Sequence, residues 1–250
     1  MRSLLLAVTS LSLAGAGCRV DRSQRRQPDM AEFSQRAPVR SETGLEATLQ
    51  LGVGALELSA GRGPDLYALE LVYDKARYSP EIRYREGSVG RLSIALAGKD
   101  RQRRLHDPRN RIRLGLTETL PLRLAVKNGV GEARLSLSGL RIENLDVESG
   151  VGSTQVSAYE PNPVGCQEVR LRTGVGGLKT TGLANLNFRE LAFDGGVGGA
   201  ELDFTGDFRR DAEIRIRVGI GGVVVRVPRG IGVVVDAEKH FLSGFQLDGF

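Results

Sequence analysis

Apolar and polar residues alternate over many short stretches of the chain, as they do in β-strands that are buried on one side only. Clear examples are Ala133–Leu137, Ala200–Phe204 and Ile214–Val218. Glycine is abundant, with 33 of 250 residues, and each glycine weakens a helix interior by about 1 kcal/mol. The chain is therefore predicted to be all-β.

A Gly-Val-Gly phrase divides the chain into units. Its first glycine stands at 129, 150, 174, 196 and, as Gly-Ile-Gly, 219, so the units are 21 to 24 residues long; an earlier copy is Gly52-Val53-Gly54. A second apolar stretch in each unit, such as Leu145–Val147, gives it at least two strands. This near-constant period predicts a single-domain β-solenoid (β-helix-like) and favours it over the alternative, a β-sandwich.

The glycines of these phrases are expected to turn the corner between strands. There, a positive φ or the close approach of the next coil would exclude a Cβ. The valine between them is expected to point into the core. The predicted repeat turns are Gly129, Gly131, Gly150, Gly152, Gly174, Gly176, Gly196, Gly198, Gly219 and Gly221.

The first eighteen residues resemble a bacterial lipoprotein signal. Arg2, a short apolar run and small residues precede Cys18, so residues 1–17 are predicted to be a signal peptide and Cys18 the lipidated residue. Arg19 after the cysteine favours the outer membrane in a host that has one. Residues 18–43 are polar and rich in Arg, Ser and Gln, which predicts a disordered basic tether before a domain at 44–250.

The stretch from Pro121 to Ser157, with its two Gly-Val-Gly phrases, resembles the bacterial toast-rack domains of LiaF-type envelope proteins and the related putative-adhesin domains. The resemblance extends from about Leu51 to Val235. It implies a β-solenoid on the cell envelope and brings no catalytic residues with it.

Few residue types suited to catalysis or cofactor binding are present. There is no Trp, and two His and two Cys cannot form a usual metal cage, so neither a metal nor a cofactor is expected. Cys166 is interpreted as a packed thiol, and His106 and His240 as surface residues. Nucleic acid binding is not expected of an exported chain without interleaved aromatics.

Paired carboxylates are the basis of an enzyme alternative. Glu201 and Asp203, like Asp146 and Glu148, lie two apart on predicted strands and so share a face at about 6 to 7 Å, a separation that glycoside hydrolysis can use. Outward polar residues are also what strand alternation requires. We therefore predict no enzyme, and keep a carbohydrate-active β-helix enzyme as the alternative.

A basic insertion at residues 99–113 falls in the longest gap between repeats. It could bind anionic lipid, a cell-wall polymer or an acidic envelope protein, which makes a periplasmic polyanion-binding protein a second alternative. Residues 236–250, with Phe241, Phe245 and Phe250, are predicted to cap the solenoid after a last strand at Ile231–Val235. The main prediction is a lipid-anchored envelope module for scaffolding, adhesion or stress sensing. The predicted patch is Lys99, Arg101, Arg103, Arg104, Arg109, Arg111 and Arg113.

Overall fold

The computed structural model describes residues 28–99, 109–236 and 246. In this part of the chain the protein forms eleven strands and one short 3-10 helix, η1 (Leu183–Leu186). The strands are β1 (Met30–Pro38), β2 (Gly44–Ala60), β3 (Asp65–Asp74), β4 (Tyr78–Arg85), β5 (Val89–Gly98), β6 (Arg111–Leu116), β7 (Pro121–Ser136), β8 (Arg141–Ser157), β9 (Cys166–Thr181), β10 (Phe188–Asp203) and β11 (Glu213–Arg226).

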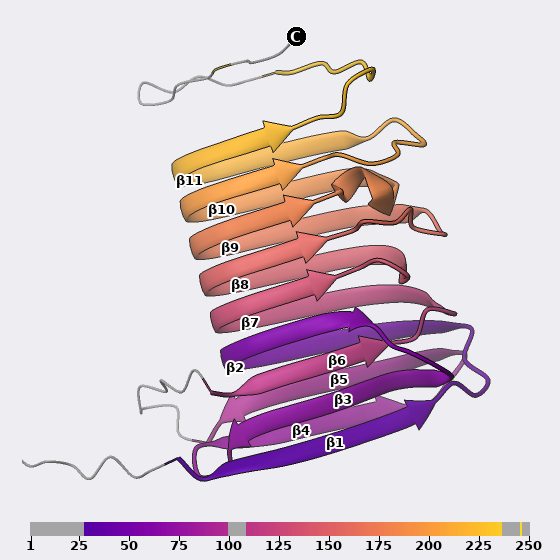
Figure 1. The fold of residues 1–250 in the computed structure, drawn as a ribbon, viewed down its shortest axis with the longest axis vertical. Helices are drawn as coiled ribbons and strands as arrows, with labels where there is room; N and C mark the ends of the chain where they lie inside the picture. The colour runs from indigo at the N-terminus through magenta and orange to yellow at the C-terminus, as the bar shows by residue number, and fades with distance from the viewer. Residues whose placement is uncertain (1–27, 100–108, 237–245, 247–250) are drawn as a thin grey trace, which may run out of the picture.

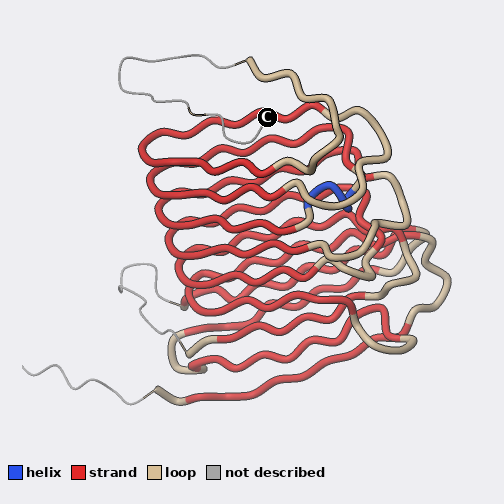
Figure 2. Tube along the Cα trace, turned by 45° about the horizontal axis from the view of Figure 1, so that its top comes forward, coloured by secondary structure: helices blue, strands red, loops and turns tan. Residues whose placement is uncertain are grey.

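The strands are stacked one above the other in a single sheet that folds back on itself (Figures 1 and 2). From β2 to β11 each long strand pairs in parallel with the next, in the order β2-β7-β8-β9-β10-β11. Every one of these strands bends in the middle, and a loop returns the chain to the start of the next. This arrangement confirms the predicted all-β solenoid.

The bends coincide with the Gly-Val-Gly phrases, which confirms the predicted turning role of their glycines. The phrases lie inside one continuous strand, so the two strands expected in each unit are its two arms: a first arm before the phrase and a second arm after it. Both glycines are required by the stacking of the backbone. A Cβ on Gly150 would lie 2.4 Å from the carbonyl oxygen of Gly129, and one on Gly152, whose φ is +134°, would lie 1.9 Å from that of Gly131.

The valine between the glycines points outward, so its predicted inward position is wrong. The apex of the bend holds only backbone, and a side chain there can extend only away from the core. Val151, Val175 and Val197 are each about half exposed, and Ile220 more so.

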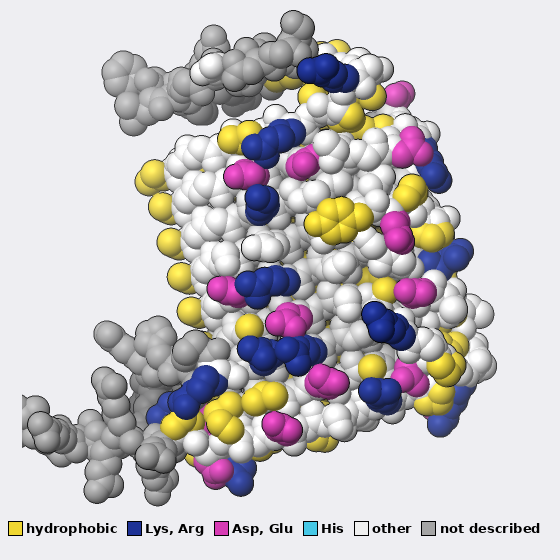
Figure 3. Space-filling model, in the orientation of Figure 1, with side chains coloured by type: hydrophobic (Ala, Val, Ile, Leu, Met, Phe, Trp, Pro, Cys, Tyr) yellow, Lys and Arg dark blue, Asp and Glu magenta, His cyan; other side chains and the backbone are white. Residues whose placement is uncertain are grey.

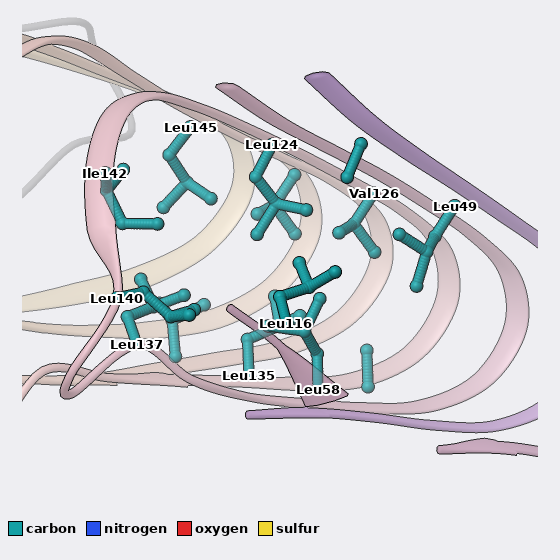
Figure 4. Close-up of a cluster of buried hydrophobic side chains, with 14 of the residues drawn as sticks. Leu49, Leu58, Leu116, Leu124, Val126, Leu135, Leu137, Leu140, Ile142 and Leu145 are labelled. Carbon is teal, nitrogen blue, oxygen red and sulfur yellow. The ribbon is translucent and has the colours of Figure 1, made fainter. Parts of the chain in front are cut away.

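The core fills the space between the two arms of each strand (Figure 4). Leu124 and Val126 on the first arm of β7 face Leu135 on its second arm, and the same positions repeat along the stack as apolar ladders. All three side chains are at most 2% exposed. Each coil therefore buries its apolar face against its own other arm and against the coils above and below it.

The N-terminal end of the stack is built from shorter strands. Below β2, one coil is split into β5, paired with the first arm, and β6, paired with the second. The split falls where that coil would bend, and the described ends of the predicted insertion, Lys99 and residues 109–113, lie on either side of it. Asn110 occupies this bend, where its side-chain amide donates to the carbonyl of Val53 and its Oδ1 accepts from the backbone of Asp74.

Below the split coil, β3 and β4 run antiparallel to β6 and β5, and β1 pairs antiparallel with β3. The predicted disordered tether is thus wrong for residues 30–38, which form β1, and the domain begins before residue 44. This strand is polar, and its ordering rests on backbone hydrogen bonds with β3. A polar edge strand of this kind has no apolar alternation for sequence reasoning to detect.

Buried asparagines hold the loops that join successive coils. The side chain of Asn162 donates to the carbonyls of Ile142 and Leu186, and that of Asn185 donates to the carbonyl of Ala158. These bonds satisfy backbone groups that leave the parallel ladder.

At the C-terminal end, β11 is the last strand. The strand predicted at Ile231–Val235 is wrong, since these residues lie outside any strand and are exposed. Phe241, Phe245 and Phe250 of the predicted cap lie outside the described residues. None of the described helices is long and apolar enough to span a membrane.

Candidate binding surface

A trough of about 680 Å³ lies on the outer side of the second arms. It crosses β3, β6, β2, β7, β8 and β9 at right angles to the strands. Six strands at the usual spacing give it a length of about 24 Å. We call it the outer trough; its lining includes Glu57, Ser59, Arg62, Ala68, Glu70, Arg113, Gly115, Arg134, Ser136, Gln155, Ser157, Tyr159, Lys179 and Thr181.

Strand register explains the shape of the outer trough. Small residues occupy one outward position on every strand and form the floor, whereas the outward position two residues away carries long side chains that form one wall. The floor is the ladder Ala68, Gly115, Ser59, Ser136, Ser157 and Thr181; the wall is the ladder Glu70, Arg113, Glu57, Arg134, Gln155 and Lys179.

The charges of the wall differ between its two ends. At the β3 end, Arg113 lies 2.8 Å from Glu57 and 3.9 Å from Glu70, and the hydrogen bond with Glu57 raises the pKa of its guanidinium. At the β9 end, the carboxylates that pair with Arg134 and Lys179 are Glu132 and Glu201, which do not line the trough. Lys179 therefore faces the hollow with no acid of the lining beside it, whereas Arg134 is the register partner of Glu57. Figure 3 shows charged side chains of both signs over this face.

Tyr159 stands across the floor from this charged wall. It continues the outward positions of β8 beyond Ser157, and at 70% exposure it is the most exposed aromatic of the described residues. Its backbone amide donates to Ser138 Oγ, which fixes the turn after β8. A solvated ring beside a floor that carries hydroxyl groups is suited to contact with a ligand.

Sequence reasoning missed the outer trough. Alternation identifies which side chains point outward, but the floor depends on which strands are neighbours, and β6, from a distant part of the chain, lies between β2 and β3. The one available signal was the recurrence of Ser or Thr at the end of successive alternating stretches, at Ser136, Ser157 and Thr181.

A second exposed feature is the row of apolar side chains along the bends, which forms a column at the left edge of Figure 3. Register places Val53, Val130, Val151, Val175, Val197 and Ile220 in one ladder. From Val151 onward the side chains of this row are about half exposed or more, whereas Val53 packs against the core. We call this row the valine ridge.

The predicted basic patch is only partly described. Arg111 and Arg113 lie on β6 and point outward, and Arg113 is ion-paired in the wall of the outer trough. Lys99 and Arg109 flank the bend of the split coil, and Lys99 Nζ donates to the carbonyl of Lys75. Arg101, Arg103 and Arg104 lie outside the described residues, so whether the seven form one patch stays a prediction.

The carboxylate pairs considered for catalysis lie on the outer sheet faces and are engaged with neighbouring groups. Glu201 pairs with Arg226 at 3.1 Å, and Asp203 accepts from the amide of Thr205. Asp146 and Glu148 both lie against Arg172. In the described part of the chain, no three His, Cys, Asp or Glu residues are grouped to hold a metal.

Cys166 is a buried free thiol, in agreement with its interpretation as a packed residue, and burial raises its pKa to about 12. It is therefore protonated at neutral pH and is not a nucleophile there. Cys18, His106 and His240 lie outside the described residues, so lipidation of Cys18 stays a prediction.

Comparison with known proteins identifies relatives of this fold. Residues 25–181 match the family model of the N-terminal domain of toast_rack, DUF2154. A solved structure from Clostridium sporogenes ATCC 15579, described as a "putative cell adhesion protein", is 21% identical and has a TM-score of 0.62, with 79% of this chain and 99% of that chain covered. A "putative adhesin" from Bacteroides fragilis NCTC 9343 is 11% identical with a TM-score of 0.32 and covers 80% and 99% of the two chains. No curated protein matches the sequence significantly.

Proposed function

Because the chain belongs to the family of toast_rack N-terminal domains, we propose that it is a non-catalytic binding module of the bacterial cell envelope. The observation that carries this proposal is the outer trough, which crosses six strands and is lined by hydroxyl groups, charges and an exposed ring. Its walls belong to a sheet whose neighbouring coils hold one another in register. Such a surface is preorganised for an extended ligand and needs no moving parts.

Among scaffolding, adhesion and stress sensing, adhesion is the role we propose. The protein from C. sporogenes that shares the fold is described as a putative cell adhesion protein. An adhesion module needs a rigid binding face at the cell surface, and the outer trough supplies a candidate for that face.

Attachment to the membrane through a lipid on Cys18 is the second part of the proposal. Eleven residues separate Cys18 from Met30, where β1 begins. This connection spans at most about 40 Å, so an anchored domain stays near the membrane surface. The order of signal-like segment, cysteine and short connection supports an exported lipoprotein, placed in the outer membrane of a host that has one.

The carbohydrate-active enzyme is less well supported. Glu201 and Asp203 are not in the lining of the outer trough, and the acids that are in it, Glu57 and Glu70, share Arg113 between them. A glycosidase acid must hold a proton near neutral pH, which a neighbouring guanidinium opposes.

Anchoring is tested in the native host by mass spectrometry of the N-terminal peptide, beside a Cys18→Ser variant. We expect an acylated Cys18 in the membrane fraction and release of the variant from it. An unmodified N-terminus in the soluble fraction would contradict the anchor.

Binding is tested with cells that display the full chain. Adhesion to immobilised cell-wall material is expected to fall when Ser136→Trp and Ser157→Trp together fill the trough floor. The matched control is Ser153→Trp, since Ser153 points outward on β8 near the bend and outside the trough. Equal adhesion of all three cell types would sink the binding role of the trough.

A further inference from the structure

The outer trough has three properties that together define a ligand class. Its floor repeats once per strand, it offers hydroxyl groups at consecutive steps, and Arg134 and Lys179 face it from β7 and β9. We propose that the trough binds a linear acidic polysaccharide, whose chain lies across the strands with its sugar units above the serine and threonine ladder. This inference rests on the proposed function and names the ligand of the same site.

The spacing of the floor is the first argument. Ser136, Ser157 and Thr181 are register partners on β7, β8 and β9, so their hydroxyls recur at the interstrand distance of about 4.8 Å. This distance is close to the length of one pyranose unit in an extended chain. A polymer with that repeat can place a hydroxyl group against each strand in turn.

The absence of bulk on the floor is the second argument. Ser136, Ser157 and Thr181 are half-buried between longer neighbours, whereas Arg134 and Lys179 on one side and Tyr159 on the other rise above them. A flat chain of rings fits between these walls. The ring of Tyr159 supplies an apolar face for one sugar, and the hydroxyls bond to its edge.

Charge is the third argument. Arg134 and Lys179 are more than half exposed, and their carboxylate partners lie outside the trough. Exposed ion pairs of this kind contribute little, so their cations can exchange one carboxylate for another. A carboxylate on the ligand would restore the charge-assisted bond, and Arg62 in the β2–β3 loop adds a further exposed cation to the lining.

The acids that face the trough limit where the polymer lies. Glu70 on β3 and Glu57 on β2 flank Arg113 on β6, and Glu57 is also the register partner of Arg134 on β7. The acidic groups of the ligand are therefore placed over β7, β8 and β9, beside Arg134, Gln155 and Lys179.

The test uses calorimetry with the exported chain carrying Cys18→Ser, and two probes: an oligogalacturonate hexamer and the hexamer in which every carboxylate is reduced to an alcohol. We expect the acidic hexamer to bind, and added salt to weaken it. Arg134→Gln and Lys179→Gln should each weaken it about tenfold. Tyr159→Ala, at a side chain exposed enough to leave folding intact, should weaken both hexamers.

Arg123→Gln and Arg170→Gln are the matched controls, because these arginines are equally exposed but lie on the outer side of the first arms. Binding unchanged in these two variants supports the trough as the site. Equal losses in the controls, equal binding of the neutral hexamer, or no binding of the acidic one would each overturn the inference. If neither hexamer binds while Ser136→Trp with Ser157→Trp still abolishes adhesion of cells, the polysaccharide is wrong and the binding module stands.

Discussion

The two ends of the stack are built differently. At the N-terminal end, β3 and β4 reverse the strand direction, β1 covers β3, and Tyr67 and Tyr78 are buried to 1% exposure. At the C-terminal end, no described strand pairs with the outer edge of β11. Leu202 on β10 is fully buried, whereas its register partner Val225 on β11 is 45% exposed.

This difference shows where the stability of the fold comes from. Val225 occupies the same position in the ladder of inward side chains as Leu202 on β10. It differs in having no described coil on its outer side. The free energy of each coil is thus largely a sum of contacts with its two neighbours, as in other solenoids. Substitutions inside the stack and at β11 should therefore differ in a predictable way.

The largest difference is expected between a bend glycine and a glycine just past a bend, since the bend glycine of β11, Gly221, is as crowded as Gly152. Gly152→Ala would force a Cβ into the carbonyl oxygen of Gly131 at a residue with a φ of +134°, and should lower the free energy of unfolding by about 3 to 5 kcal/mol. Gly222→Ala on β11 has no atom within 4 Å of its Cβ and should change it by less than about 0.5 kcal/mol. Denaturant unfolding followed by circular dichroism measures the free energy of unfolding of both variants. Similar losses in the two would contradict the idea that close backbone stacking requires glycine at the bends.

A conservative core change should give the next largest difference. Val156, at 1% exposure, and Val225 are members of the same inward ladder. Val156→Ala should cost about 2 kcal/mol, from lost burial and the cavity that remains, and Val225→Ala less than about 1 kcal/mol. If the two variants unfold at the same denaturant concentration, β11 is covered in solution by something beyond the described residues.

The contrast between these two valines also shows how far sequence reasoning reaches. The period of the glycine phrases and the alternation around them predict the solenoid, because both depend on contacts that repeat in every coil. They do not reveal that Val151 points outward, because the regular alternation of inward and outward side chains is interrupted where the strand bends. Nor do they reveal β1, or Asn110 at the split bend, whose partners lie far away in the chain. The outer trough could not be predicted for the same reason: its floor joins Gly115 and Ser59, which only the register brings together.

A partly buried hydrogen bond between Tyr84 and Glu42 at the N-terminal end should make the stability of the fold depend on pH. Tyr84 donates to the carboxylate of Glu42, which is 6% exposed, and this bond lowers the pKa of Glu42. A carboxyl group with a lowered folded pKa adds stability above its unfolded pKa and loses it as the pH falls below about 4.5. Burial raises the pKa of Tyr84, so its contribution is lost as the pH rises above 10.

Tyr84→Phe should accordingly cost about 1 to 2 kcal/mol at pH 7 and flatten the loss of stability between pH 5 and pH 3. Thermal unfolding across this range, with Tyr73→Phe as the control, measures the effect. If Tyr84→Phe loses as much stability between pH 5 and pH 3 as the wild type, other carboxylates determine the stability at acidic pH.

The smallest difference is expected among the outward ion pairs, which contribute to register rather than to burial. Arg172 on β9 has strands on both sides and lies 2.8 Å from Asp146 and 3.6 Å from Glu148, whereas Arg217 on β11 lies 3.8 Å from Asp194. All are substantially exposed, so Arg172→Gln should cost at most about 1 kcal/mol and Arg217→Gln a few tenths. Both losses should shrink as salt is added, because exposed charges are screened. A salt-independent loss at Arg172 would mean that its aliphatic stem matters more than its charge.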